Sequence, residues 1–130
     1  MQAPNAPHVL LVEDNIVALH FIETISTQAG LKFTSAMNGK QALELATSHT
    51  FDLIITDIGL PELSGYELTQ AIRHWEKIYA KKPVPIIGLT ARLEARNECL
   101  QSGMNHMLCK PIDLKNLKDL VRQFCNFYML

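Results

Sequence analysis

Each of four short apolar runs in this chain of 130 residues ends on a polar side chain that can hold a metal ion or a phosphoryl group. If the runs are parallel strands of one sheet, their carboxyl ends lie along one edge, and the polar side chains converge there. In chain order, the convergent residues are Glu13, Asp14, Asp57, Thr90 and Lys110. We therefore expect a site with three carboxylates, a hydroxyl and an ammonium group.

The three carboxylates of Glu13, Asp14 and Asp57 would repel one another unless a cation lies between them. Mg²⁺, or Mn²⁺ in its place, resolves the conflict through oxygen ligands while keeping water in its shell. A carboxylate beside such an ion can attack phosphorus and form an acyl phosphate, and Asp57 is the candidate nucleophile. The Thr90 hydroxyl and the Lys110 ammonium would then bind the transferred group.

Each of these residues also has a simpler interpretation. Glu13 and Asp14 could cap the first helix and favour its dipole, and Asp57 could be a turn residue. Thr90 could cap the next helix, and an isolated lysine such as Lys110 is usually solvated. Asp57 shifts the balance towards a metal site, because it would place a third carboxylate at the same edge.

Apolar runs alternate with helical patterns about five times along the chain, which is typical of βα units around a parallel sheet. Three runs are almost continuously apolar, as expected for strands that helices cover on both faces: Val9–Val12, Leu53–Ile55 and Ile86–Leu89. Lys32–Ala36 predicts an edge strand, and Met107–Cys109 predicts a further strand. Right-handed crossovers favour a doubly wound α/β sheet whose ligands bind at the carboxyl ends of the strands.

Apolar residues at helical spacing predict a helix after each strand. The apolar stripe of the first helix includes Phe21, and the helix is expected to end at Gly30. The polar stretch from Glu76 to Pro83 predicts a surface loop after the third helix. The fourth helix, 93–101, has the poorest periodicity, is expected to end at Gly103 and is the expected mobile element. Asp113 is the predicted cap of the fifth helix.

Composition narrows the function classes. With 12 basic and 13 acidic residues the net charge is -1, which indicates neither nucleic-acid binding nor an anionic membrane as a partner. The three cysteines, Cys99, Cys109 and Cys125, lack C-x-x-C spacing and are interpreted as free thiols in a reducing compartment. No apolar stretch approaches the ~20 residues of a membrane span, and residues 1–7 do not resemble a signal peptide. We expect one cytoplasmic domain.

Four motifs, in this order and spacing, resemble the receiver domain of two-component response regulators. They are LLVEDN (Leu10 to Asn15), DLIITDIGLPELSGYEL (Asp52 to Leu68), IIGLTA (Ile86 to Ala91) and CKPID (Cys109 to Asp113). The resemblance covers nearly the whole chain, so we expect a receiver domain at 8–127 between a flexible segment 1–7 and a tail 128–130. It implies a single-domain flavodoxin-like (βα)5 fold, with a five-stranded parallel sheet of order 2-1-3-4-5 and helices on both faces.

The resemblance also implies a metal and acceptor set. Asp57 would be the phosphoacceptor, and Glu13, Asp14 and Asp57 would bind Mg²⁺, with Glu13 often acting through water. The carbonyl of Gly59 would complete the protein ligands. Glu13, Asp14 and Asp57 lie in motifs that match the family, whereas Gly59 is a position that varies in the family and would contribute only its backbone carbonyl.

The residues around the expected phosphoryl-binding side chains match the family motif less completely. Thr90 and Lys110 would bind the phosphoryl group, and the bond from Lys110 to Pro111 would be cis. The switch position three residues before the lysine is usually Tyr or Phe, but here it is Met107, which carries neither a ring nor a hydroxyl. The residue before the lysine is usually Thr or Ser and here is Cys109, interpreted as core packing. How the signal leaves the site is therefore open.

We expect a phosphorylation switch rather than a true enzyme. Asp57 would take a phosphoryl group from a phosphohistidine on a histidine kinase or a histidine phosphotransfer protein. Movement of Thr90 would then change the surface formed by the fourth helix, fifth strand and fifth helix. The sequences of the motifs resemble those of receivers fused to hybrid sensor histidine kinases. Homodimerisation on phosphorylation is left open. The alternatives are a receiver-like interaction module that is not phosphorylated and, ranked last, an aspartyl-phosphate phosphohydrolase, which would need an acid where Gly59 stands.

Overall fold

A five-stranded parallel sheet with the order β2-β1-β3-β4-β5 forms the centre of the fold in the computed structural model, which describes residues 6–125. The strands are β1 (His8–Val12), β2 (Lys32–Ala36), β3 (Leu53–Asp57), β4 (Ile86–Thr90) and β5 (His106–Cys109). The helices are α1 (Ile16–Gln28), α2 (Gly39–Ser48), α3 (Gly65–Ile78), α4 (Arg96–Ser102) and α5 (Leu114–Phe124), with a short 3₁₀ turn, η1 (Leu93–Ala95), before α4. The predicted strand order is confirmed.

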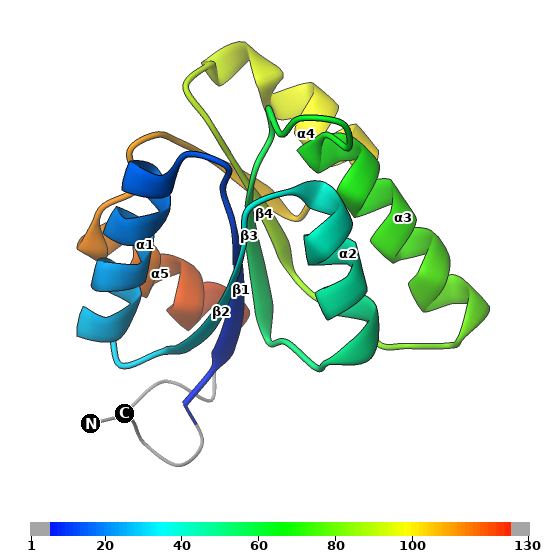
Figure 1. The fold of residues 1–130 in the computed structure, drawn as a ribbon, viewed down its shortest axis with the longest axis horizontal. Coiled ribbons are helices and arrows are strands. Elements are labelled where there is room, and N and C mark those ends of the chain that lie inside the picture. The colour runs from blue at the N-terminus through cyan, green and yellow to red at the C-terminus, as the bar shows by residue number, and fades with distance from the viewer. Residues whose placement is uncertain (1–5, 126–130) are drawn as a thin grey trace.

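Helices cover both faces of the sheet, α1 and α5 on one side and α2, α3 and α4 on the other (Figure 1). The alternation within β1 shows the two layers, because Leu11 packs into the core under α1 and α5 whereas Leu10 packs into the core under the other three helices. Every residue of β3 and β4 is buried. Burial on both faces explains why these two runs are almost continuously apolar.

Side-chain caps fix where four of the helices begin. Asn15, Asn38 and Asp113 each accept a hydrogen bond from the backbone N–H three residues later, and Ser64 forms a capping box with Glu67. The predicted cap at Asp113 is confirmed. No side-chain hydrogen bond caps α4, so the connection from β4 into this helix lacks the anchor that the other four helices have.

Two helices end at glycines in the left-handed region, as predicted. Gly30 follows α1 with a φ of 78°, and Gly103 follows α4 with a φ of 109°. The predicted fourth helix, however, is not one continuous element, because the 3₁₀ turn Leu93–Ala95 precedes the seven-residue α4. The helix is interrupted at the position where α4 begins without a side-chain cap.

Two expectations about single side chains were wrong. Phe21 lies on α1 but is 46% exposed, because it faces the outer edge of the site and not the sheet. Glu76, expected in a surface loop, lies within α3 and is only 4% exposed. Its carboxylate accepts hydrogen bonds from Arg73 Nη1 at 2.8 Å and from the backbone N–H of Val84 at 2.8 Å. These bonds offset the desolvation of the carboxylate and allow the helix to continue to Ile78.

None of the helices within residues 6–125 is long and apolar enough to cross a membrane. The predicted segment 1–7 lies outside the described residues except for 6 and 7, and the predicted tail 128–130 lies wholly outside them.

Candidate functional site

The carboxyl ends of four strands bring the predicted site residues together. Glu13 follows β1, and its backbone N–H donates to Ala36 O at the end of β2. Asp57 is the last residue of β3 and Thr90 the last of β4. Lys110 follows β5, where its backbone N–H donates to Thr90 O at 2.9 Å. The parallel pairing of the strands thus confirms the expected convergence at one edge of the sheet.

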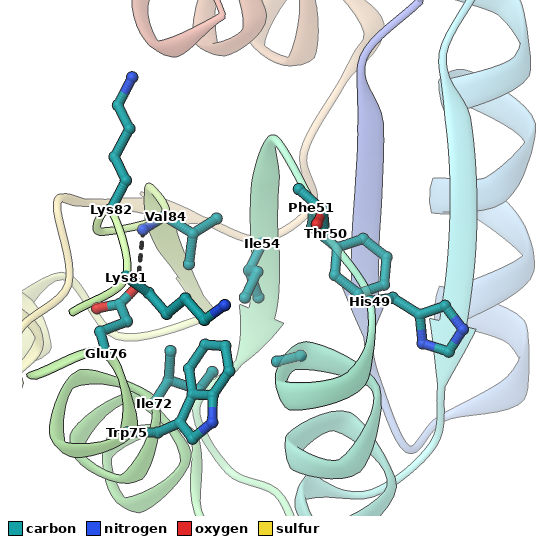
Figure 2. A pocket seen from close by; sticks show the side chains of 11 residues that line it. His49, Thr50, Phe51, Ile54, Ile72, Trp75, Glu76, Lys81, Lys82 and Val84 are labelled. Atoms are coloured by element: carbon teal, nitrogen blue, oxygen red, sulfur yellow. Dashed lines mark hydrogen bonds between the residues drawn. The ribbon is translucent and has the colours of Figure 1, made fainter. Parts of the chain in front are cut away.

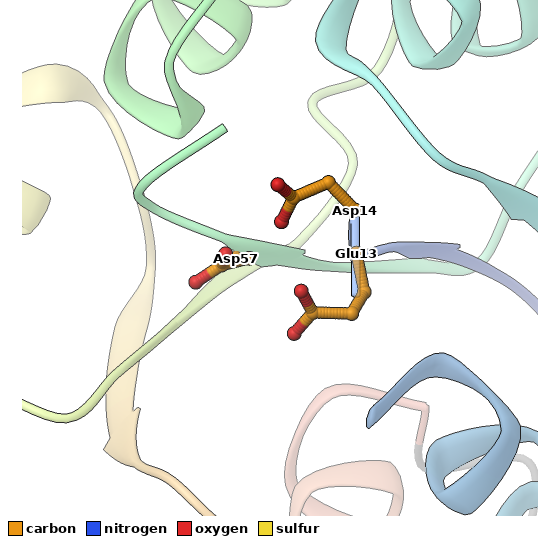
Figure 3. Close-up of side chains that lie close together, drawn as sticks. All are labelled: Glu13, Asp14 and Asp57. Atoms are coloured by element: carbon orange, nitrogen blue, oxygen red, sulfur yellow. The ribbon is translucent and has the colours of Figure 1, made fainter. Parts of the chain in front are cut away.

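Three carboxylates form the centre of this site. One oxygen from each of Glu13, Asp14 and Asp57 lies within 4.8 Å of the others. Figure 3 shows the three carboxylate groups projecting to the same side of the strand ends. Glu13 and Asp57 are buried, at 1% and 8% exposure, whereas Asp14 is exposed. Oxygen donors this close together are the ligand set that a hard divalent cation such as Mg²⁺ favours.

The carboxylates of Glu13 and Asp14 differ in what they already bind. Glu13 Oε1 accepts from Lys110 Nζ at 2.7 Å, and Glu13 Oε2 accepts from the backbone N–H of Asn15 at 3.1 Å. Among residues 6–125, no hydrogen bond or ion pair engages the carboxylate of Asp14. The Asp14 oxygens are therefore open to solvent or a metal ion, whereas those of Glu13 are held by the protein.

Lys110 balances part of the negative charge. Its Nζ lies 2.7 Å from Glu13 Oε1 and 3.1 Å from Asp57 Oδ1. Burial by itself lowers the pKa of the Lys110 ammonium, but hydrogen bonds and charge attraction from Glu13 and Asp57 outweigh it and raise the pKa above its usual value. The side chain stays cationic at neutral pH. The predicted cis bond between Lys110 and Pro111 is confirmed.

Thr90 and Gly59 lie on the opening of the site. The Thr90 side chain is nearly buried, and its Oγ1 accepts from the backbone N–H of Arg92 at 3.1 Å, which leaves the hydroxyl hydrogen free to donate to a ligand. Gly59 is exposed two residues beyond Asp57, and a Cβ added there would meet nothing within 4 Å. The space next to the Gly59 backbone is therefore open.

Two positioning residues were missed by the sequence reasoning. The backbone of Asn15 holds Glu13 in place, as described above, and Gly65 lies directly against the end of β3. A Cβ at Gly65 would come within 2.5 Å of the Asp57 carbonyl oxygen, and the Gly65 N–H donates to Ile58 O at 2.8 Å. The Ser-x-x-Glu capping box that contains this glycine marks the helix start, but no sequence signal shows the close backbone approach.

An apolar groove of about 450 Å³ borders the site on the α1 side. Val17, Phe21 and Ile112 line it together with Glu13 and Lys110. On α1, Val17 is 75% exposed and Phe21 46% exposed. Exposed apolar side chains beside a charged cleft are typical of a protein contact surface.

Comparison with known proteins identifies the family. Residues 9–122 match the family model described as the response regulator receiver domain. Over 118 residues the chain is 39% identical to the sensor histidine kinase GacS of Pseudomonas protegens, a match that covers 89% of this chain and 13% of that protein. The chain thus spans only a small part of the curated relatives that it matches first.

Solved receiver domains share the fold. The receiver domain of the response regulator Ssk1 of Saccharomyces cerevisiae, solved with the histidine phosphotransfer protein Ypd1, matches with a TM-score of 0.89 and 29% identity over 96% of this chain and 92% of that chain. The receiver domain of a sensor histidine kinase of Pseudomonas aeruginosa, solved with a magnesium ion in its active-site cleft, matches with a TM-score of 0.82 and 36% identity over 93% and 98%. The fold, the acidic edge of the sheet and these matches agree, and the chain belongs to the receiver domain family of two-component signalling.

Proposed function

We propose that this domain accepts a phosphoryl group from a phosphohistidine onto Asp57. An Asp57 carboxylate oxygen attacks the phosphorus, a P–O bond forms, and the P–N bond to the donor imidazole breaks. The imidazole leaves with the bonding electron pair and takes up a proton from solvent. The observation that carries the proposal is the placement of Asp57 beside two further carboxylates and the Lys110 ammonium at the edge of the sheet.

Charge decides what else the reaction needs. Three carboxylates against one ammonium leave a formal charge of −2 at the site, which would repel an anionic phosphoryl group. We propose that Asp14, Asp57 and the carbonyl of Gly59 hold Mg²⁺ or Mn²⁺ directly. Glu13 would act through a water molecule, because the protein already occupies both of its oxygens. The metal ion would supply charge neutralisation for the attacking and the transferred groups.

Lys110 and Thr90 would bind the transferred group on the protein side. The Lys110 ammonium already touches Asp57 Oδ1 at 3.1 Å, so it can pair with a phosphoryl oxygen on that carboxylate without a large movement. The Thr90 hydroxyl retains its hydrogen for a second contact. These roles make the domain a switch that assists its own phosphorylation and dephosphorylation.

We infer that phosphorylation moves the Thr90 side chain. This movement would alter the packing of α4 through a sulfur-rich contact between the sheet and that helix. Gly88 pairs with Met107 on β5, two pairs before Thr90 pairs with Cys109. A Cβ at Gly88 would meet Met104 Sδ at 2.7 Å and Cys99 Sγ at 3.4 Å. Methionine adapts its shape easily, so this contact can repack without an aromatic side chain at position 107. The surface of α4, β5 and α5 would carry the output.

The proposed phosphoryl donor is a histidine kinase or a histidine phosphotransfer protein. The Ssk1 receiver was solved with such a phosphotransfer protein, and here the exposed Ile16, Val17 and Phe21 lie on α1 beside the site. An origin in a hybrid kinase is consistent with the match to GacS. Cys99, Cys109 and Cys125 are free, which supports a reducing, cytoplasmic location.

Intact mass spectrometry tests the proposal. After incubation with acetyl phosphate and Mg²⁺, the wild type should gain one phosphate, and the adduct should disappear when EDTA replaces the metal. Asp57→Asn should gain none, whereas Asp52→Asn, a partly exposed aspartate at the opposite edge of the sheet, is the matched control and should gain one. An undiminished adduct in Asp57→Asn would exclude Asp57 as the acceptor. A wild type that never gains phosphate would favour the interaction module that is not phosphorylated.

A further inference from the structure

A small cavity lies at the amino ends of the strands, at the opposite edge of the sheet from Asp57. It has a volume of about 190 Å³ and is enclosed by the end of α2, the end of α3 and the connection into β4 (Figure 2). Its apolar lining includes Ile54, Ile72 and Val84, with Trp75 and Phe51 on either side. None of these residues has a part in the phosphoryl chemistry proposed above.

The rim of this cavity is positively charged. Lys81 and Lys82 are both exposed, and Lys81 Nζ lies 5.8 Å from the centroid of the Trp75 ring, facing the opening. The acidic residue in the lining is Glu76, whose carboxylate is already neutralised by Arg73 and bonded to the Val84 N–H. The Lys81 side chain therefore faces the opening, whereas the Lys82 side chain begins at the rim and extends away from the cavity (Figure 2). No unpaired carboxylate in the lining competes for these two charges.

Size limits what the cavity can hold. Pockets for cofactors and drug-sized ligands usually measure roughly 300 to 1,000 Å³. A volume of about 190 Å³ is too small for these and suits one large apolar side chain. Just beyond the cavity, Ile78 and Tyr79 at the end of α3 are 60% and 62% exposed, so the contact surface extends past the opening.

We propose that this cavity binds an acidic peptide segment of a partner protein. One aromatic or aliphatic side chain of the segment inserts between Trp75 and Phe51, and carboxylates on either side of it pair with Lys81 and Lys82. Charge complementarity selects a short acidic segment over a longer polyanion, because two lysines offer little for tracking a phosphate backbone. The site is independent of phosphate acceptance at Asp57.

Trp75 gives a direct readout, because it is the only tryptophan in the chain. The probe is the blocked peptide Glu-Asp-Phe-Asp-Glu, titrated into the full chain while Trp75 fluorescence is followed. A saturating blue shift that weakens with added salt is expected. Peptides with alanine in place of the phenylalanine, or with lysine in place of the acids, should leave the fluorescence unchanged.

Variants locate the site. Lys81→Glu combined with Lys82→Glu should weaken binding of the acidic peptide by about tenfold or more, because two attractions become repulsions. Lys40→Glu with Lys118→Glu makes the same charge change away from the cavity and should not alter the affinity. Ala46→Leu adds bulk at the cavity lining and should also abolish binding. An unchanged cooperative thermal unfolding, followed by circular dichroism, shows that each variant is folded.

Three results would overturn the inference. The first is a fluorescence that does not respond to the acidic peptide at any concentration up to the millimolar range. The second is an equal loss of affinity in the Lys40→Glu and Lys118→Glu control. The third is tighter binding to a single-stranded oligonucleotide or to vesicles that contain phosphatidylserine, which would assign the basic rim to a different class of partner.

Discussion

Replacing Asp14 by asparagine should stabilise the metal-free domain. The Asp14 carboxylate has an oxygen within 4.8 Å of oxygens of both Glu13 and Asp57, and within residues 6–125 it has no ion-pair partner. Asp57 and Glu13 each pair with Lys110, so removing either of those carboxylates also removes an attraction. The gain from Asp57→Asn should therefore be smaller than the gain from Asp14→Asn.

The size of the effect follows from the distances. Two unit charges at this separation repel by about 0.9 kcal/mol in water, and by about four times as much at an effective dielectric of 20. Because Asp14 is exposed, the lower value applies. The Lys110 ammonium, which pairs with both Glu13 and Asp57, offsets about one of the two repulsions. A net gain of about 1 kcal/mol corresponds to an increase in unfolding temperature of about 4 °C for a domain of this size.

Thermal unfolding with and without Mg²⁺ is the assay. At ten times its dissociation constant, the metal ion should stabilise the wild type by about 1.4 kcal/mol, or roughly 5 °C. Asp14→Asn should lose most of this metal-dependent increase. The variant should therefore unfold above the wild type in EDTA and below it in Mg²⁺, and this reversal of order is the signature of a metal site built on mutually repelling carboxylates.

Glu44→Gln is the control, because it removes one negative charge from an exposed position on α2. It should leave both the stability in EDTA and the response to Mg²⁺ unchanged. If Asp14→Asn lowers the unfolding temperature in EDTA, or keeps the full Mg²⁺ response, the assignment of Asp14 as a repelled, direct metal ligand is wrong.

Three further predictions concern the surroundings of the site and the core. Gly65→Ala should cost about 1 to 3 kcal/mol in urea unfolding and slow phosphorylation, because its Cβ would meet the Asp57 carbonyl oxygen at 2.5 Å; equal rates would show that the strand end tolerates the shift. Arg73→Met should lower the free energy of unfolding by about 3 kcal/mol, because it leaves the buried Glu76 carboxylate without its cation; adding Glu76→Gln should recover part of that loss. Burial raises the pKa of the Cys125 thiol from 9.0 to about 11, so the folded state retains a proton that the unfolded state loses. Its contribution to stability should be complete below pH 9 and fall between pH 9 and 11, and Cys125→Ala should remove this part of the pH dependence.

The sequence was sufficient for the fold and for the convergence of the site because both depend on local patterns. Continuous apolar runs identify β3 and β4 as strands buried on both faces, and the parallel arrangement then puts Asp57 and Thr90 at one edge. Gly103 and Asp113 mark a helix end and a helix start through conformation and capping chemistry that a sequence shows directly.

The errors and omissions come from contacts and exposures that the local sequence pattern does not show. The sequence around Glu76 is typical of a polar loop, but Glu76 is buried in the fold. Its carboxylate pairs with Arg73 and accepts a hydrogen bond from the backbone N–H of Val84. Phe21 follows the apolar stripe of α1, yet it is half exposed beside the site. The need for glycine at position 65 arises from the backbone of Asp57 and Ile58 at the end of β3, eight and seven residues away along the chain.

The most direct test of the account is to locate the phosphoryl group. The domain phosphorylated by acetyl phosphate and Mg²⁺ is reduced with borohydride, which converts an acyl phosphate of aspartate into homoserine, and the peptides are then sequenced by mass spectrometry. We predict homoserine at position 57 and at no other aspartate, in an amount that falls with EDTA and in Lys110→Ala. Homoserine at position 14, or a phosphate that survives on a serine, threonine or histidine, would contradict the assignment of Asp57 as the acceptor.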